Sequence, residues 1–460
     1  MMARAPGAAA RVGGLIGLVA ALFTGACGLY VSDNARLEEP GAPPAPYDPG
    51  QVAVFLALSG GGTRAAALSY GAMTALEAIA VPGEDGQAST LLREVDYISA
   101  VSGGSFTAAF YAHLAGEPSR RRFDEIVDRV LHRNLELEIA VRLFANPLNW
   151  FRLPFTAYDR TQVAAGLYGA TIFDGARLGD LPLRPRLILN ASDLGTGLRF
   201  EFSPAAFRCL GSDHARYPLG HAVAASSAFP GAFTSITLTN HGGDARACLA
   251  ERDRRALTPA TREVNPLRTA RAERRLQYLD RGEARYVHLA DGGITDNLGL
   301  DAVLDLLSAD GELGRRINQR RLKAVAVISV NATPAAPMEI GRARGGPGVL
   351  AVVLRAFDLF LWDAGAETVN DLSRTLEEKA DFARVTGRDL RLFFIEVKFD
   401  DIADPARRVA LASIGTRLGL PAAQVDALMA AGRELVASGR NGRNRAELDG
   451  LVEVFGSLRR

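Results

Sequence analysis

Residues 52–64 read VAVFLALSGGGTR, and this stretch decides the fold class. Its first seven residues are all apolar, which is typical of a strand buried on both faces of a parallel sheet. Three glycines follow, and then the apolar periodicity of Ala66–Ile79 predicts a helix. Glycines between a strand and a helix let backbone N–H groups turn toward one point, where they stabilise an anion. That anion is either a phosphate or a developing oxyanion.

Two phosphate-binding patterns do not fit this glycine loop. A P-loop ends in Gly-Lys followed by Ser or Thr, and no such ending is present. A dinucleotide site would place glycine at position 65, where the chain has Ala65. The loop by itself therefore does not identify a ligand.

Further strands and helices alternate along the chain. Val95–Val101 is a second apolar run, and small residues lead from it into a helix through Phe106, Phe110 and Leu114. Other strand candidates are Leu187–Asn190, Val325–Val330 and Leu392–Val397. Near the C-terminus, a helix begins after Pro421, has one apolar face with Val425, Leu428, Met429 and Leu435, and ends at Gly439. This alternation predicts an α/β layered fold with a mainly parallel sheet.

Composition limits the function classes. The chain has 460 residues, of which 48% are hydrophobic and 23% charged, as in ordinary globular proteins. Because 53 Lys and Arg nearly balance 52 Asp and Glu, the sequence carries no global electrostatic footprint for nucleic acid. Three cysteines do not make a disulfide scaffold or a zinc site, and no His, Asp or Glu cluster has ligand spacing. We therefore expect no metal and no cofactor.

The N-terminus resembles an export signal. Arg4 and Arg11 precede the uncharged apolar stretch Val12–Phe23, and small residues then lead to Cys27. The stretch is shorter than the roughly 20 residues of a membrane span. A cysteine directly after small residues resembles a bacterial lipobox, although Thr24 stands where Leu is usual. Cleavage before Cys27 would leave a lipidated N-terminal cysteine.

These features predict three parts: a lipoprotein-type signal peptide over 1–26, a Pro-rich tether over 27–50, and one folded domain over 51–460. The tether is predicted because five prolines and two glycines crowd residues 40–50. Lipidation would make the protein a membrane-anchored lipoprotein of the bacterial cell envelope, facing the periplasm or the cell surface. An ordinary signal peptide and an uncleaved anchor are the alternatives.

Export also changes the interpretation of the other two cysteines. In an oxidising compartment Cys209 and Cys248 can pair. Closing the loop between them would stabilise the fold by about 3–4 kcal/mol. Two unrelated buried thiols are the alternative.

Two further motifs contain residues with catalytic chemistry. AVSGG at 100–104 ends the second strand and is a variant of the G-x-S-x-G nucleophile elbow, with Ala100 in place of the first glycine. Ser102 would thus lie at the C-terminal end of a parallel strand, where α/β sites are found. A tight turn with a structural serine is the alternative, and Ser105 is the second candidate nucleophile.

The third motif is LADGGITDN at 289–297. It follows the apolar stretch Tyr286–Leu289, which would place Asp291 at the end of a strand. A desolvated, positioned carboxylate can accept the proton of a serine. Asp296 is the nearest competitor for this role, and an Asp-Gly-Gly turn with a purely structural role is the alternative.

In this order and context, the glycine loop, the serine elbow and the Asp-Gly-Gly motif resemble the patatin-like phospholipases. Two segments between them, NASDLGTG at 190–197 and AVAASSAFP at 222–230, also resemble that family. The resemblance covers about 52–330, the motif core, and extends more loosely over the helical C-terminal part, 331–460. Ala100 and Ala65 depart from the family's pattern.

The resemblance implies a three-layer α/β/α sandwich and a lipid acyl hydrolase that uses a Ser–Asp dyad and an acyl-enzyme, without a catalytic histidine. The positions that carry over are Ser102 as nucleophile, Asp291 as base, Gly61 and Gly62 as oxyanion-hole donors, Gly60 and Arg64 as supports of that loop, Gly103 and Gly104 in the elbow, and Gly292 and Gly293 in the Asp-Gly-Gly motif. The implied partners are a lipid or phospholipid substrate and a membrane surface, with no cofactor and no nucleic acid.

Two other functions stay open. A Ser-His-Asp esterase would need a histidine, and His221 is a better third member than His288, which would point to the opposite face of its strand from Asp291. In the usual triad order the histidine comes last, and none follows Asp291. A non-catalytic envelope protein that binds lipid on the same fold is the second alternative.

Three segments have no assigned role. Residues 123–178 and 241–287 interrupt the strand–helix alternation. The second holds ten arginines between Arg252 and Arg285, which are either a solvated surface or a face for anionic lipid head groups. The apolar segment Val349–Trp362 is expected in the core, with a segment that dips into a membrane as the alternative.

Overall fold

A computed structural model describes residues 34–38, 47–83, 87–145, 159–243, 248–249, 251–264, 266–334, 344–346, 348–439 and 442–459. The predicted signal peptide and Cys27 lie outside these ranges, as does the aromatic, proline-containing stretch 146–158 within segment 123–178. Among the residues described, no helix is both long and apolar enough to span a membrane.

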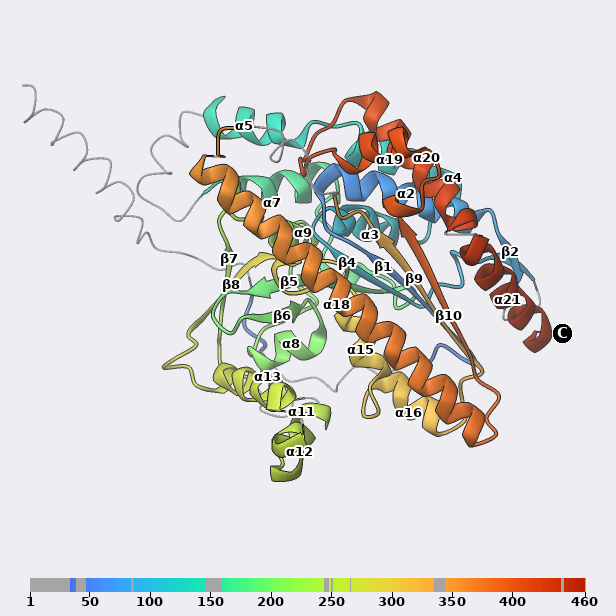
Figure 1. Cartoon of the computed structure of the whole chain (residues 1–460). Helices are drawn as coiled ribbons and strands as arrows, with labels where there is room; N and C mark the ends of the chain where they lie inside the picture. Colours follow the sequence, from blue (N-terminus) through green and yellow to red (C-terminus); the bar gives the residue numbers. More distant parts are fainter. Residues whose placement is uncertain are drawn as a thin grey trace, which may run out of the picture.

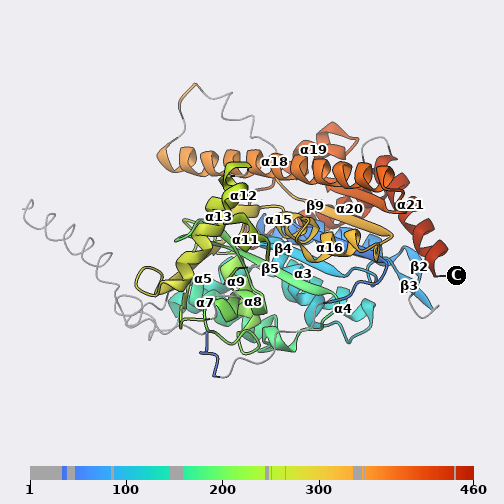
Figure 2. The ribbon, with the colours of Figure 1, turned by 90° about the horizontal axis from the view of Figure 1, so that it is seen from below.

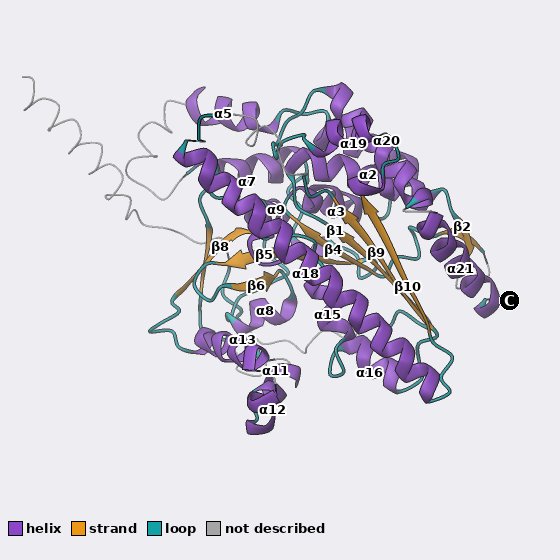
Figure 3. Cartoon of the chain, in the orientation of Figure 1, coloured by secondary structure: helices purple, strands orange, loops and turns teal. Residues whose placement is uncertain are grey.

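The elements alternate as the sequence predicts (Figures 1 and 3). The strands are β1 (Val52–Leu58), β2 (Ala80–Pro82), β3 (Ala88–Thr90), β4 (Tyr97–Val101), β5 (Arg186–Asp193), β6 (Leu198–Glu201), β7 (Ile236–Thr239), β8 (Tyr286–Asp291), β9 (Ala324–Asn331) and β10 (Arg391–Lys398). The helices are α2 (Gly62–Glu77), α3 (Gly103–His113), α4 (Ser119–Ile126), α5 (Leu135–Ala145), α7 (Arg160–Thr171), α8 (Pro204–Cys209), α9 (Leu219–Ser226), α11 (Glu251–Ala256), α12 (Pro259–Val264), α13 (Pro266–Leu276), α14 (Gly293–Asp296), α15 (Asp301–Leu307), α16 (Glu312–Asn318), α18 (Val349–Val385), α19 (Pro405–Ala412), α20 (Ala422–Ser438) and α21 (Arg443–Leu458).

The central sheet is mainly parallel, which confirms the predicted fold class. Its order is β10-β9-β1-β4-β5-β8-β7, with β6 also paired to β5. The five strands from β10 to β5 are mutually parallel. At the other end, β6 and β8 run antiparallel to β5, and β7 runs antiparallel to β8. The antiparallel strands therefore all lie on one side of the parallel core.

The register of β8 brings its C-terminal end to the catalytic edge of the sheet. An antiparallel strand would ordinarily end at the opposite edge from its parallel neighbours. However, β8 pairs only with the last three residues of β5, and Asp291 lies opposite Ala191. The end of β4 is at the same level, because Val101 lies opposite Asn190. The end of β8 and the end of β4 thus meet across β5.

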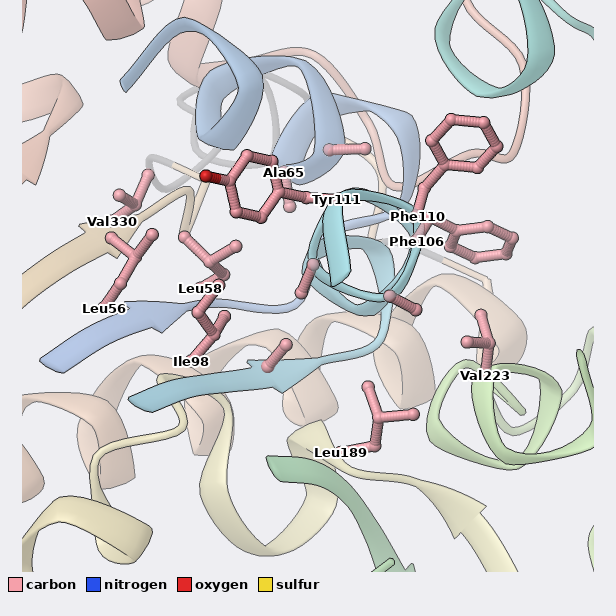
Figure 4. Close-up of a cluster of buried hydrophobic side chains, with 14 of the residues drawn as sticks. Leu56, Leu58, Ala65, Ile98, Phe106, Phe110, Tyr111, Leu189, Val223 and Val330 are labelled. Atoms are coloured by element: carbon pink, nitrogen blue, oxygen red, sulfur yellow. The ribbon is translucent and has the colours of Figure 1, made fainter. Parts of the chain in front are cut away.

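Side chains on the two faces of β1 enter two different cores, as its continuous apolar sequence requires. Leu56 belongs to the larger core with α2, α3, α20 and α21, whereas Phe55 packs with α15, α16 and part of α18. Figure 4 shows Leu56, Leu58 and Ile98 on the larger-core side, pointing toward the helices that carry Ala65 and Tyr111. Figure 2 shows α18 as a separate layer on the other face of the sheet. The architecture is an α/β/α sandwich.

The C-terminal helices belong to this sandwich. Helix α20 follows Pro421 and ends at Gly439, as predicted. It packs very closely on α2: a Cβ on Gly71 would lie 2.1 Å from the Met429 carbonyl oxygen, and one on Gly432 would lie 2.3 Å from the Leu68 carbonyl oxygen. Glycine at both positions therefore allows the two helix backbones to touch.

None of the described side chains of Val349–Trp362 is buried, contrary to the sequence-based expectation that this segment lies in the core. It forms the first part of α18, and Val352, Leu359, Phe360 and Trp362 are about half exposed. Among the described side chains of α18, the first buried one is Leu372. Apolarity alone therefore did not decide the burial of these side chains.

The described parts of the predicted tether pack on the domain. Asn34 is buried, and its amide donates to Ser212 Oγ at 2.7 Å and accepts from the Thr239 backbone N–H at 2.9 Å. Further along, the Tyr47 hydroxyl donates to Asp96 Oδ1 at 2.8 Å. Residues 34–38 and 47–50 are thus attached to the folded unit.

The Arg-rich segment 241–287 contains the surface helices α11, α12 and α13 (Figure 1). Several of its arginines form ion pairs with acidic residues, namely Arg255 and Arg268 with Asp310, Arg262 with Glu273, and Arg275 with Asp253. A disulfide between Cys209 and Cys248, with an S–S distance of 1.93 Å, joins this segment to the end of α8. Part of the arginine charge therefore stabilises the segment itself.

Candidate active site

Ser102 occupies a strained turn between β4 and α3. Its backbone has φ 49° and ψ −120°, a conformation that is unfavourable for a residue with a side chain. The turn is tight because its neighbours are glycines: a Cβ on Gly103 would lie 2.0 Å from the Gly62 carbonyl oxygen, and one on Gly104 2.7 Å from the Leu58 carbonyl oxygen. This is the geometry of a nucleophile elbow, with the glycine loop pressed against it.

The Ser102 hydroxyl donates a hydrogen bond to Asp291 Oδ2 at 2.6 Å. Both residues are buried, with 6% and 4% of their surface exposed. The other carboxylate oxygen of Asp291 accepts the Gly293 backbone N–H at 2.8 Å, which holds the carboxylate in place. Two residues 189 positions apart in the sequence thus form one serine–carboxylate pair.

Burial raises the pKa of Asp291 to about 6, and the hydrogen bonds from Ser102 and Gly293 oppose that shift. A carboxylate with a raised pKa holds a proton more strongly than one in water, and it is still mostly ionised at neutral pH. Asp291 is therefore a better proton acceptor than an ordinary aspartate, without losing its charge.

The glycine loop offers two backbone donors next to Ser102. Gly61 and Gly62 begin α2 with φ of +136° and +59°, conformations that favour glycine. The neighbouring N–H groups are used: Gly60 donates to the Asn297 carbonyl and Thr63 to the Arg417 carbonyl. Among the described residues, the N–H groups of Gly61 and Gly62 have no acceptor. They are the donors left for a ligand at the start of this helix.

Arg64 ties the glycine loop to the C-terminal part of the chain. Its side chain is buried and donates to the Ala332 carbonyl at 2.9 Å, to the Ile414 carbonyl, and to Thr416 Oγ1 at 3.4 Å. Burial lowers its pKa to about 10, while the charge of Asp358 on α18 acts in the opposite direction. The segment after residue 330 is thus part of the site's support.

Ser226, at the end of α9, holds both halves of the pair. Its hydroxyl accepts the Ser102 backbone N–H at 2.9 Å and donates to the Asn190 carbonyl at 2.7 Å. Its own carbonyl accepts the Gly292 N–H at 3.0 Å, directly after Asp291. The sequence singled out segment 222–230 by resemblance but assigned no role to Ser226. An apolar segment with two adjacent serines does not reveal which hydroxyl points inward.

The competing candidates have other partners. Ser105 lies on α3, and its Oγ is 2.8 Å from Ser226 Oγ on α9. Asp296 accepts the backbone N–H groups of Leu300 and Asp301 at 3.2 and 2.9 Å, so it shapes the turn after the Asp-Gly-Gly motif. Burial, followed by the charge of Asp301, raises the Asp296 pKa to about 7. Ser102 and Asp291 are the pair that the structure brings together.

The pair opens into a small pocket of about 30 Å³. The pocket is lined by Gly60, Gly61, Arg64, Ser102, Phe229, Asp291, Asn297, Thr333, Pro334, Asp358, Leu361 and Thr416. In the described part of the chain, no group of three or more His, Cys, Asp or Glu residues is placed to hold a metal ion.

The fold and this site define a class: an α/β/α sandwich with a buried serine–carboxylate pair beside a glycine loop, the arrangement of a serine hydrolase. The sequence model of the family described as "Patatin-like phospholipase" matches residues 56–304, more than half of the chain. The chain therefore belongs to the patatin-like phospholipase family. This confirms the resemblance seen in the motifs.

Solved structures add a distant likeness. Human GIVD cytosolic phospholipase A2 is 13% identical with a TM-score of 0.40, and the match covers 88% of this chain and 62% of that one. The same human protein in complex with methyl gamma-linolenyl fluorophosphonate is 12% identical with a TM-score of 0.38, covering 88% and 59%. This chain thus spans about three fifths of the length of those structures. A search of the curated proteins found no match.

Proposed function

We propose that the protein cleaves carboxylic ester bonds of lipids or phospholipids through a Ser102–Asp291 dyad and an acyl-enzyme. The observation that carries the proposal is the buried 2.6 Å hydrogen bond from Ser102 Oγ to Asp291 Oδ2. Family membership supports the same reaction class. The segments 123–178 and 241–287 do not define a preferred lipid head group, so the proposed substrate class is a lipid acyl ester.

The geometry accounts for each proton and bond. Asp291 takes the Ser102 proton while Ser102 Oγ attacks the ester carbonyl carbon. The resulting oxyanion is stabilised by the Gly61 and Gly62 N–H groups, and losing one such donor costs about 10²–10³ in rate. The C–O bond to the leaving alcohol then breaks, and protonated Asp291 returns its proton to that oxygen. Water hydrolyses the acyl-enzyme by the same steps and releases a fatty acid.

The positions of the histidines favour the dyad over a Ser-His-Asp triad. All six histidines lie in described segments, and none lines the pocket that contains Ser102 and Asp291. His288 Nδ1 is within 2.8 Å of Thr237 Oγ1 on the neighbouring strand. His221 lies in α9 beside the Tyr217 ring. A triad would require one of these rings to contact the Asp–Ser pair.

The test is product analysis on defined phospholipids, with release of fatty acid measured for the wild type, Ser102→Ala and Asp291→Asn. We expect both variants to lose at least about 10³-fold in turnover, because each removes a group that acts in bond formation. Ser227→Ala is the matched control and should keep activity, since the Ser227 hydroxyl donates to the Val223 carbonyl at 2.8 Å and does not line the pocket. Loss of turnover on substituting any single histidine would replace the dyad with a triad.

Covalent labelling separates the enzyme from a lipid-binding scaffold. A fluorophosphonate should label Ser102 in the wild type and fail to label Ser102→Ala. A folded wild type that is never labelled, and that behaves in lipid assays as Ser102→Ala does, would favour the scaffold.

We also propose lipidation at Cys27 and a place in the bacterial cell envelope. This proposal rests on the sequence before Cys27 and on the attachment of Asn34 to the domain. Asn34 follows Cys27 by seven positions, a distance of at most about 25 Å along an extended chain. A lipid on Cys27 would thus hold this side of the domain close to the bilayer. Loss of palmitate incorporation and of membrane fractionation in Cys27→Ser tests the proposal.

A further inference from the structure

Asn297 is a polar residue of the catalytic pocket that the acylation step described above does not use. It directly follows α14, the single helical turn after the Asp-Gly-Gly motif, and it lines the pocket together with Ser102 and Asp291. Its backbone carbonyl accepts the Gly60 N–H at 2.9 Å. Asn297 thus joins the Asp-Gly-Gly segment to the glycine loop, and this hydrogen bond holds its backbone at the site.

The side-chain amide of Asn297 is largely buried but has no partner. The residue is 9% exposed, and among the described residues its amide makes no hydrogen bond. Its two polar atoms remain accessible to water. Most buried polar groups in proteins have a hydrogen-bond partner, and one without a partner needs an explanation. In a catalytic pocket, the explanation we favour is that the amide binds a molecule that takes part in the reaction.

Two glycines define where the oxygen of this amide lies. A Cβ on Gly60 would lie 2.5 Å from Asn297 Oδ1, and a Cβ on Gly293 would lie 2.9 Å from the same atom. Each glycine has a Cα–H group in place of that Cβ, so Oδ1 faces two weak C–H donors. These contacts favour an oxygen over an NH₂ group at this position. The amide therefore presents its hydrogen-bond acceptor between the two glycines.

The same acceptor lies close to both members of the dyad. The Cβ that Gly293 lacks would be 3.0 Å from Asp291 Oδ1, and the Cβ that Gly60 lacks would be 3.3 Å from Ser102 Cβ. One water with hydrogen bonds of about 2.5–3.0 Å can therefore bridge Asn297 Oδ1 and the Asp291 carboxylate. The pocket of about 30 Å³ has room for about two waters, since one water needs about 10–15 Å³.

We propose that Asn297 Oδ1 binds the water that hydrolyses the acyl-enzyme. The inference rests on the proposed function, because it assigns a residue to the second half of that reaction. Once Ser102 is acylated, its oxygen can no longer donate to Asp291 Oδ2, so the carboxylate is open to a new donor. A water that donates one hydrogen to Asp291 and the other to Asn297 Oδ1 keeps a lone pair for the acyl carbon.

Each bond and proton of this step is accounted for. Asp291 removes one proton as the water oxygen bonds to the acyl carbon, and the carbonyl electron pair moves to the oxyanion on the glycine loop. The bond from the acyl carbon to Ser102 Oγ then breaks, and Asp291 gives its proton to that oxygen. Asn297 transfers no proton. Because the dyad has no histidine, the second acceptor supplies the direction that a carboxylate alone does not give the water.

The rate of deacylation tests the inference. A p-nitrophenyl ester releases nitrophenol on acylation and the fatty acid only on deacylation. Asn297→Leu removes the acceptor while keeping a side chain of similar size and the backbone hydrogen bond from Gly60. We expect a burst of about one nitrophenol per enzyme, followed by turnover about tenfold or more below wild type, because one hydrogen bond to the transition state is lost. Mass spectrometry of the quenched variant should find the acyl group on Ser102.

Labelling by a fluorophosphonate separates the two halves of the reaction, because it needs attack by Ser102 and no water. Asn297→Leu should be labelled at the wild-type rate, and hydroxylamine, a stronger nucleophile than water, should restore most of its turnover. Asn297→Ala removes the acceptor without apolar bulk and should behave in the same way. Asn318→Leu, at an exposed position at the end of α16 outside the pocket, is the matched control and should match wild type.

The outcomes distinguish this inference from the proposed function. An equal loss of labelling and turnover in both Asn297 variants would make Asn297 a structural support and overturn the inference. Unchanged turnover, or slow turnover without a burst, would overturn it as well. A wild type that is neither labelled nor able to hydrolyse any ester would instead refute the proposed function.

Discussion

Ser226→Ala is the substitution that most directly probes how the dyad is held. It removes one buried oxygen, which accepts the Ser102 N–H at 2.9 Å and donates to the Asn190 carbonyl at 2.7 Å. Ser226 is 0% exposed, so water does not readily replace these hydrogen bonds. The backbone hydrogen bond from Gly292 to the Ser226 carbonyl remains. The variant thus releases the nucleophile while keeping the Asp-Gly-Gly turn attached.

The magnitude follows from the hydrogen bonds lost. A buried donor or acceptor left unsatisfied costs about 1–3 kcal/mol, so loss of the partners of the Ser102 N–H and the Asn190 carbonyl lowers the free energy of unfolding by about 2–6 kcal/mol. Ser102 has φ 49°, and its strained backbone will relax when that anchor is removed. Each 1.4 kcal/mol lost from the transition state is about tenfold in rate. We expect kcat/KM to fall about 10- to 100-fold.

The assay combines urea unfolding with the rate of fluorophosphonate labelling at Ser102, measured on the folded fraction. A merely structural role would lower stability and leave the labelling rate per folded molecule unchanged. Ser227→Ala is the control, because the Ser227 hydroxyl donates to the Val223 carbonyl at 2.8 Å within the same helix. Wild-type labelling by folded Ser226→Ala, or an equal loss in Ser227→Ala, would refute the reasoning.

Three further predictions follow from the site and its surroundings. Asp291 has a pKa of about 6 and must lose its proton to act as the base. The value of kcat/KM on a neutral ester should therefore rise about tenfold per pH unit up to about pH 6 and then level off. A flat profile of kcat/KM between about pH 5 and 8 would contradict this role. Gly62→Ala should reduce kcat/KM at least about 10²-fold. The added Cβ would lie 2.3 Å from the Arg417 carbonyl oxygen, so the backbone N–H that serves as oxyanion donor would be displaced. A near-normal kcat/KM would exclude Gly62 from the oxyanion hole. Replacing Cys209 and Cys248 together by Ser should lower the free energy of unfolding, measured in urea, by about 3–4 kcal/mol. The reason is that the chain between these cysteines, which are 39 positions apart, no longer forms a covalently closed loop. An unchanged urea midpoint would rule out this contribution.

The Gly62→Ala measurement has a matched control. Gly166→Ala adds a Cβ that meets no heavy atom within 4 Å, so it should leave kcat/KM unchanged and show that a methyl group alone is harmless. The pH dependence of stability is opposite in direction to the pH dependence of activity. Because the folded pKa of Asp291 is raised, its contribution to stability is present at low pH and is lost as pH rises toward about 6.

Much of the fold was predictable because its signals are local. The apolar strand 52–58, the three glycines after it and the small residues around Ser102 each constrain the backbone within a few positions. Their order was enough to predict an α/β sandwich and to select Ser102 and Asp291 from several serines and aspartates. The same local patterns predicted the helix after Pro421 and its end at Gly439.

What the sequence by itself determined about this protein is therefore the set of elements and the chemical groups at their ends. Only the tertiary structure decided that β8 runs antiparallel and pairs with the last residues of β5, which is how Asp291 reaches Ser102. It also decided that Ser226 binds the backbone N–H groups of Ser102 and Gly292 and that Leu361 of α18 lines the pocket. The physical reason is that periodicity and turn residues act over a few positions. Register, side-chain direction and burial are decided by packing between segments far apart in the chain.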